Sequence, residues 1–219
     1  QWKKHLLPEK AERRSYLSAA DQARLMAALR PDFLPLVRFC LATGARIGSA
    51  VGLTWKDVDF SNRTLTFRKM KGGGEHTIPL TKALLVLLAN EKHHPIYVFT
   101  YECQEDRPKG TNGVRRKKGE RYPFSRDGWR RPWQRALKDA GLEGFRFHDL
   151  RHTAGSRITK AAGIAVAQKL LGHAEITTTR RYSHVLMDDV KQAMERTERH
   201  LKDTGDSGAS KIANKTGLK

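Results

Sequence analysis

The stretches FRFHDLRHT (145–153) and KLLGHAEITTTRRYSHV (169–185) decide the fold of this chain. They predict consecutive helices over 148–162, 164–171 and 176–183, and a glycine follows the second one, where helices commonly end. Histidines, arginines and one tyrosine follow one another closely along these segments. Such a set of cations favours an anion as ligand, because guanidinium groups bind oxyanions such as phosphate in a fork-like geometry.

The segments on the amino-terminal side are also mainly helical. Ser18, with Asp21 three residues later, has the pattern of a helix N-cap, and the helix is expected to run on to Pro31. TLTFRK (64–69) alternates like a strand and HTIPL returns after a glycine turn, so a β-hairpin is expected over 64–80. Other elements are expected at about 33–43, 48–53, 81–92, 97–100 (a strand or buried extended piece), 127–140 and 186–202. The expected fold is therefore mainly α with a small antiparallel β-hairpin sheet.

The 219 residues are enough for one large domain with a core. Residues 1–16 are polar and charged and are interpreted as a linker. Residues 17–202 are interpreted as the domain itself, and 203–219, which are small and polar, as a flexible tail. The first residue is Gln1 rather than Met, so we expect a fragment that a further domain precedes.

The chain is strongly basic, with 42 Lys and Arg against 23 Asp and Glu and a formal net charge of +19. An excess of this size indicates a polyanionic partner, usually nucleic acid. The alternative is a ribosomal-type or tail-driven charge, but the basic residues are spread through the apolar-periodic segments. The segment 102–126 is predicted to be a surface loop because it combines Gly, Pro and Asn with a basic run. We expect the following residues of that run to bind phosphates without reading bases: Arg115, Arg116, Lys117, Lys118 and Arg121.

The two cysteines, Cys40 and Cys103, provide neither a disulfide framework nor a zinc set. Cys40 lies in an apolar stretch and is interpreted as a small core residue. A reducing compartment is therefore expected. Since no apolar run reaches the ~18 residues of a membrane span, we expect a cytoplasmic protein that acts on DNA and does not contact a membrane.

HDLRH (148–152) places His148, Arg151 and His152 on one face of a helix. The two histidines have the spacing of a zinc pair, but Arg151 beside a metal cation is electrostatically unfavourable. Asp149 also stands where a zinc-protease motif has Glu. Binding of an oxyanion by the histidine and arginine is the stronger interpretation. A solvated arginine at a helix start remains the alternative.

Two further cations have similarly open interpretations. Arg46 lies between the helix end at Gly44 and the next helix, where it could bind a phosphate or pair with a carboxylate. Lys71 lies at the tip of the hairpin before three glycines, where it could contact a ligand or simply be exposed. Lys69 is a neighbouring candidate for the same role.

His173 follows an apolar helix and a glycine, and Tyr182 comes nine residues later. A single histidine or tyrosine is usually a packing residue. The surrounding sequence is what favours a functional role for this pair.

Taken together, TGAR with Arg46, HDLRH with His148 and Arg151, LGH with His173, and Tyr182 resemble the tyrosine recombinase (phage integrase) family. Lys71, eight residues before Pro79, resembles the family's catalytic lysine in position. The resemblance covers about residues 17–200 and includes all six active-site positions. The segment 102–126 looks longer and more basic than a minimal member needs, and the family's usual amino-terminal core-binding domain is absent.

The resemblance implies the tyrosine recombinase catalytic-domain fold, with residues 1–16 as the linker from a core-binding domain. It also implies site-specific recombination through a 3′-phosphotyrosyl bond formed by Tyr182, which integrates or excises a phage or another mobile element. Arg46, Arg151 and His173 would bind the phosphate, His148 or a neighbour would accept the tyrosine proton, and Lys71 would protonate the leaving oxygen. No metal, ATP or other cofactor is expected.

Two other functions remain open, a type IB topoisomerase-like nicking-closing enzyme and a catalytically silent DNA-binding module. The expected partner is double-stranded DNA. A homotetramer on paired sites is expected, with an isolated domain that can be monomeric. The amphipathic segment 186–202 is expected to bury its apolar face against a neighbouring protomer, with packing on its own domain as the alternative.

Overall fold

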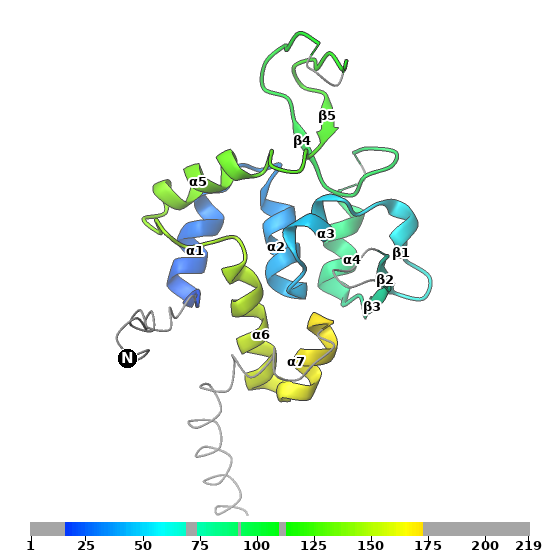
Figure 1. The fold of residues 1–219 in the computed structure, drawn as a ribbon, viewed down its shortest axis with the longest axis vertical. Coiled ribbons are helices and arrows are strands. Elements are labelled where there is room, and N and C mark those ends of the chain that lie inside the picture. Colours follow the sequence, from blue (N-terminus) through cyan, green and yellow to red (C-terminus); the bar gives the residue numbers. More distant parts are fainter. Residues whose placement is uncertain (1–15, 69–73, 92, 110–112, 173–219) are drawn as a thin grey trace, which may run out of the picture.

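A computed structural model describes residues 16–68, 74–91, 93–109 and 113–172 of the chain (Figure 1). Its elements are α1 (Ala19–Ala28), α2 (Leu34–Thr43), α3 (Ile47–Val51), the 3₁₀ turn η2 (Trp55–Asp57), β1 (Val58–Asp59), β2 (Thr64–Phe67), β3 (His76–Pro79), α4 (Lys82–Ala89), β4 (Thr100–Glu102), β5 (Arg121–Pro123), α5 (Arg130–Asp139), α6 (Asp149–Ala162) and α7 (Ile164–Leu171). The predicted fold class, mainly α with small antiparallel sheets, is confirmed. The helices predicted over 176–183 and 186–202 lie outside the described residues.

Helix α2 forms the centre of the fold (Figure 1). Its sequence LPLVRFCLAT is apolar on nearly every side, which is typical of a helix surrounded by others. Leu36, Val37, Phe39 and Cys40 are completely buried in it, so Cys40 is the core residue that the sequence predicted. Around α2, Figure 1 shows α1 and α5 on one side, α3 and α4 on the other, and the α6–α7 pair at one end.

The ends of the first two helices follow the predicted signals. The Ser18 hydroxyl accepts a hydrogen bond from the Asp21 backbone N–H at 3.1 Å, so it caps α1 as expected. Helix α2 ends at Gly44, whose φ of 67° is in the left-handed region that glycine adopts without steric cost. The backbone therefore turns sharply at Gly44, directly before Arg46.

The predicted hairpin forms β2 and β3, with Phe67 opposite His76 at its open end. The ladder also contains β1, which the sequence did not predict, and the strand order is β1-β2-β3. A two-residue strand is too short to show an alternating pattern. Its pairing with β2 becomes visible only when the chain folds back.

The prediction of a surface loop over 102–126 was partly wrong. The segment begins and ends in a two-stranded ladder in which β4 pairs with β5, and the backbones of Arg107 and Arg116 exchange hydrogen bonds of 2.8 and 3.1 Å farther out. We call residues 100–123 the β4–β5 hairpin. It projects from the body at the end opposite to α6 and α7 (Figure 1).

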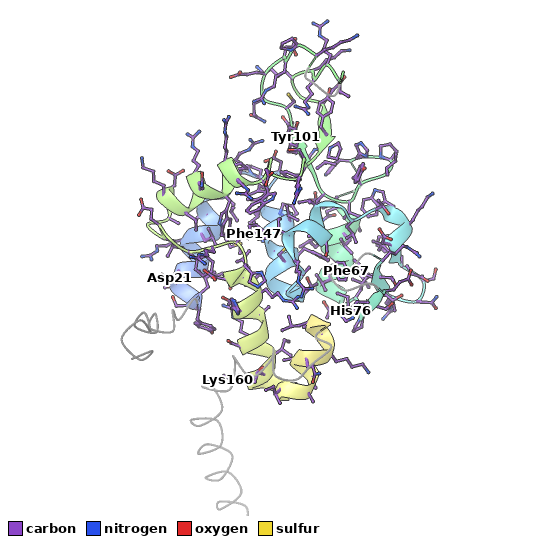
Figure 2. All side chains as sticks on the ribbon, in the orientation of Figure 1. Asp21, Phe67, His76, Tyr101, Phe147 and Lys160 are labelled. Atoms are coloured by element: carbon purple, nitrogen blue, oxygen red, sulfur yellow. The ribbon has the colours of Figure 1, made fainter. Side chains whose placement is uncertain are left out.

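Aromatic rings attach the base of this hairpin to the core. Tyr101 contacts Phe124 at 5.5 Å between ring centroids, and Phe124 contacts Phe33 at 5.7 Å. Phe33 in turn meets Phe147, which lies just before α6 (Figure 2). None of the helices in the described part of the chain is long and apolar enough to span a bilayer.

Candidate phosphate-binding site

The turn after α2 holds Arg46 in a fixed position. The Thr43 hydroxyl donates to the Phe39 carbonyl at 2.8 Å and accepts from the Ala45 N–H at 3.2 Å. Arg46 then caps the start of α3 with an extended backbone, at φ −69° and ψ 141°. Its side chain is half-buried, and no carboxylate among the described residues pairs with its guanidinium. The alternative of a structural ion pair is thus not observed in the described part of the chain.

Arg151 lies in the first turn of α6 and is only 4% exposed. Its two terminal nitrogens donate to the carbonyls of Gly44, at 2.7 Å, and Leu171, at 2.6 Å. The first carbonyl is at the end of α2 and the second is at the end of α7. Arg151 thus joins three helices, which the sequence did not predict because it interpreted this arginine as a ligand of phosphate or as solvated.

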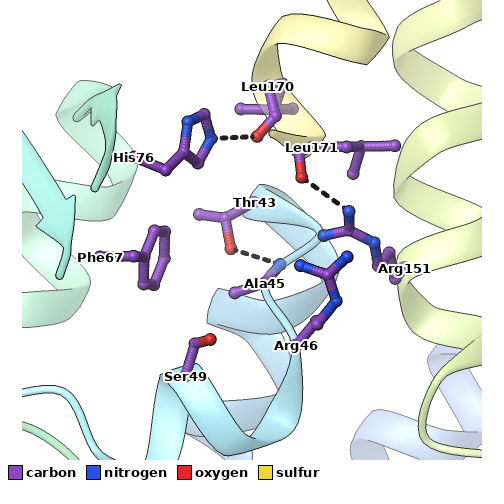
Figure 3. Close-up of a pocket in the computed structure, with 9 residues that line it drawn as sticks. All are labelled: Thr43, Ala45, Arg46, Ser49, Phe67, His76, Arg151, Leu170 and Leu171. Carbon is purple, nitrogen blue, oxygen red and sulfur yellow. Dashed lines mark hydrogen bonds between the residues drawn. The ribbon is translucent and has the colours of Figure 1, made fainter. Parts of the chain in front are cut away.

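Arg46 and Arg151 line the same small pocket, so the structure brings together these two predicted residues (Figure 3). The pocket lies between the turn after α2, the β2–β3 hairpin and the last turn of α7. Its lining residues are Thr43, Ala45, Arg46, Ser49, Phe67, His76, Arg151, Leu170 and Leu171. With two guanidinium groups and no described carboxylate in its lining, the pocket is suited to an anion.

His148 lies at the N-cap of α6, next to the two arginines. Loss of hydration, and then the positive charges of His152, Arg151 and Arg46, lower the pKa of His148, which the Asp149 carboxylate opposes. A lowered pKa favours the neutral imidazole, which is the form that can accept a proton.

The His148 and His152 rings meet edge to face, with 5.1 Å between centroids. Together they supply two nitrogen ligands, and the described residues contain no group of three or more potential metal ligands. The expectation of metal-free chemistry is a prediction that the described residues do not test.

His76 is a site residue that the sequence analysis missed. It lies in β3, half-buried, and its ring stacks on Phe67 with 6.3 Å between centroids and an interplanar angle of 14°. Its Nε2 is 2.8 Å from the Leu170 carbonyl. The available signal was its place in the hairpin next to Lys71, but a histidine in an exposed-looking hairpin does not by itself indicate a contact with α7.

The basic residues of the β4–β5 hairpin are not part of the pocket. Arg115, Lys117 and Lys118 are exposed and Arg116 is half-buried. Arg121 differs, because one of its terminal nitrogens is buried without a hydrogen-bond partner, and its charge acts on the buried carboxyl of Glu91. The hairpin therefore offers a second, separate group of cations.

Three of the predicted residues, Lys71, His173 and Tyr182, lie outside the described residues. The chain connects them to the pocket: Lys71 precedes His76 by five residues, and His173 comes two residues after Leu171. Their predicted roles stay predictions.

A model of the phage integrase family matches residues 15–218. The chain belongs to the phage integrase family. This integrase-family chain is 32% identical over 181 residues to the integrase of Salmonella phage P22, an alignment that covers 80% of this chain and 45% of that protein. It is 31% identical over 165 residues to the tyrosine recombinase XerA of Pyrococcus furiosus, covering 74% and 53%. The chain thus spans about half the length of these relatives.

Solved structures with the same fold include the catalytic domain of bacteriophage HP1 integrase. The likeness has a TM-score of 0.56 and 28% identity, and it covers 82% of this integrase-family chain and 93% of that one. The Tn1549 transposon integrase, in complex with transposon right end DNA, matches with a TM-score of 0.64 and 21% identity, covering 88% and 68%. This second likeness concerns the fold alone. The predicted catalytic-domain fold is confirmed.

Proposed function

We propose that this chain is the catalytic domain of a site-specific DNA recombinase that cleaves and rejoins strands through a 3′-phosphotyrosyl intermediate. The observation that carries the proposal is the convergence of Arg46 and Arg151, 105 residues apart in sequence, on one pocket of a phage integrase family member. The biological reaction is integration or excision of a phage or another mobile element. The relatives named integrase and tyrosine recombinase support this activity.

The scissile phosphate binds at the pocket between Arg46 and Arg151. Negative charge increases on the phosphoryl oxygens as the nucleophile approaches, and guanidinium N–H donors held in place stabilise that charge. Arg151 is positioned by the Gly44 and Leu171 carbonyls, so little reorganisation is needed at the moment of reaction. His173, which follows α7, adds a further hydrogen bond to the phosphate.

Tyr182 is the nucleophile. Its oxygen forms a bond to phosphorus while the bond from phosphorus to the 5′-oxygen breaks, so the phosphodiester energy is retained in the phosphotyrosyl bond and resealing needs no ATP. Only about one tyrosine in a thousand is ionised at neutral pH, so a base must take its proton. His148, whose lowered pKa keeps it neutral, or a neighbouring group accepts it, and Lys71 donates a proton to the departing 5′-oxygen. No metal or cofactor is required.

Double-stranded DNA is the proposed partner, and the Tn1549 integrase, which is described in complex with DNA, supports it. Arg115, Arg116, Lys117 and Lys118 would hold phosphates on the β4–β5 hairpin. Residues 17–202 would form the catalytic domain, 1–16 a linker from a core-binding domain and 203–219 a tail. Four copies on paired sites in the cytoplasm complete the proposal, and an isolated domain can be monomeric.

Two other functions give different results in the same assay. A type IB topoisomerase-like enzyme would form the covalent adduct and relax supercoils, but it would not exchange strands between two sites. A catalytically silent DNA-binding module would form no adduct. The experiment is incubation of the protein with nicked DNA carrying the element's own junction, followed by a denaturing gel, and then a two-site strand-exchange assay.

The decisive variant is Tyr182→Phe. We expect it to abolish the covalent adduct and to leave DNA affinity nearly unchanged, because the substitution removes the nucleophilic oxygen and no positive charge. The adduct is measured on the denaturing gel and the affinity by a filter-binding or anisotropy titration. A detergent-stable adduct formed by the Phe variant would show that another residue is the nucleophile.

A further inference from the structure

The last turn of α7 is held by groups from three parts of the chain. The final carbonyls of a helix have no partner within the helix and must be satisfied from elsewhere. The Gly172 N–H bonds the carbonyls of Gln168 and Lys169. The next two carbonyls, of Leu170 and Leu171, are bonded by side chains of His76 and Arg151 respectively.

The two side-chain donors come from different elements. Arg151 belongs to α6, and His76 belongs to β3 of the hairpin whose turn carries Lys71. Because a carbonyl can only accept, the Nε2 atom of His76 must carry the proton in its bond to Leu170. This bond ties the hairpin to the end of α7, immediately before His173.

The His76 ring is itself well supported. It stacks on Phe67, its cross-strand partner, and Phe67 packs against Phe39 of α2 with 6.4 Å between centroids. Between Phe67 and His76 the chain makes an eight-residue connection, whose first and last residues, Arg68 and Glu75, form an exposed ion pair at 3.4 Å. An exposed pair of this kind contributes little to rigidity. The contact between His76 and Leu170 is therefore the buried anchor of this connection.

We propose that His76 is a positioning residue, which fixes the hairpin against α7 and so places Lys71 for protonation of the leaving oxygen. The inference rests on the proposed function. His76 acts through its hydrogen bond to the Leu170 carbonyl and not by contact with the DNA.

The test compares His76→Phe, which keeps a ring against Phe67 and removes the donor, with His76→Gln, which restores a side-chain N–H of similar reach. The control is Thr77→Val, which removes the 2.8 Å hydrogen bond between Thr66 and Thr77 on the exposed face of the same two strands. We expect His76→Phe to slow cleavage by roughly 100-fold, the scale of a misplaced catalytic group. DNA affinity should be unchanged, His76→Gln should recover most of the rate, and Thr77→Val should match the parent protein.

The mechanism is tested with DNA in which sulfur replaces the bridging 5′-oxygen at the cleavage site. A thiol has a pKa near 8.5 and leaves without a proton donor. We expect this substrate to restore cleavage by His76→Phe and by Lys71→Ala to similar extents. Equal slowing of His76→Phe on both substrates, or no slowing on ordinary DNA, would overturn the proposal. If His76→Phe does not fold, His76→Asn, which is too short to reach Leu170, replaces it in every arm.

A readout without activity separates this inference from the proposed function. Amide hydrogen exchange should accelerate in 74–80 and in 164–172 in His76→Phe and not in Thr77→Val. If the parent protein forms no adduct while exchange still accelerates, the proposed function fails and the anchor is retained. Unchanged exchange in His76→Phe would show that His76 does not hold the two segments together, whatever the activity.

Discussion

The junction of α2, α6 and α7 and the β4–β5 hairpin both present arginines that the sequence assigned to DNA phosphates, but in different surroundings. In the junction, Arg151 is buried and bonded to two helix ends. In the hairpin, Arg115 and its neighbours are exposed on a short ladder attached mainly at its base. Equal residue types therefore have unequal consequences: charge in the junction is coupled to folding and geometry, whereas charge on the hairpin is coupled to solvent and salt.

The largest effect on stability is expected from Arg151→Ala. It removes two hydrogen bonds from a charged donor and leaves two carbonyls without that partner, so the free energy of unfolding should fall by roughly 3 kcal/mol. Cleavage should be lost as well. Urea denaturation followed by circular dichroism measures the first effect, and adduct formation measures the second.

Arg46→Ala is the matched comparison for Arg151→Ala. It should also cost far more in cleavage rate than in DNA affinity, because its guanidinium is needed most in the transition state. Stability should change by no more than about 0.5 kcal/mol, since Arg46 makes no ion pair within the described residues. A loss of stability like that of Arg151→Ala would remove the distinction between the two arginines.

Gly44→Ala is expected to have the next largest effect. Its left-handed backbone costs any other residue about 1–2 kcal/mol, and the added Cβ would collide with the side chain of Leu171. Since the Gly44 carbonyl also holds Arg151, cleavage should fall together with stability. Chemical denaturation and the adduct assay measure both, and normal activity in a folded variant would show that this turn does not position Arg151.

The pH dependence of stability should have opposite signs in the two regions. The folded-state pKa of His148 is lowered, so its contribution to stability is present above its unfolded value near 6.5 and is lost as the pH falls. Glu91, near the hairpin base, has its pKa raised by burial, against the charges of His93 and Arg121. Its contribution is present at low pH and is lost as the pH rises through the raised pKa.

Two variants separate these contributions. Urea titrations between pH 4 and 8 should show that His148→Gln removes stability loss around pH 6, while Glu91→Gln makes the protein more stable at neutral pH relative to acid. If His148→Gln keeps the parent protein's dependence around pH 6, the titrating group is another residue.

The smallest effect on stability is expected from neutralising the hairpin. Replacing Arg115, Arg116, Lys117 and Lys118 by Gln should change the free energy of unfolding by about 0.5 kcal/mol or less. The log–log salt dependence of DNA binding should flatten by roughly 0.9 for each phosphate that the hairpin no longer neutralises, with sequence preference unchanged. Arg121 is left in place because part of its guanidinium is buried. A shift in sequence preference would show that the hairpin contacts bases.

The sequence by itself determined the helices, because their signals are local. Ser18 and Gly44 mark helix ends through their own hydrogen bonds and backbone freedom, and the apolar pattern of 34–43 places α2 in the core. The order of Arg46, His148 and Arg151 also indicated a phosphate-binding site, since the motifs resemble a family whose model matches the chain.

Only the tertiary structure decided which partner each side chain finds. Arg151 meets a carbonyl 107 residues away, and His76 meets one 94 residues away. No local pattern encodes such contacts, because backbone carbonyls are the same in every residue and become specific acceptors only where a helix ends beside another element. The pairing of β4 with β5 across a polar segment was hidden for the same reason: short strands acquire their register from the core that holds their ends together.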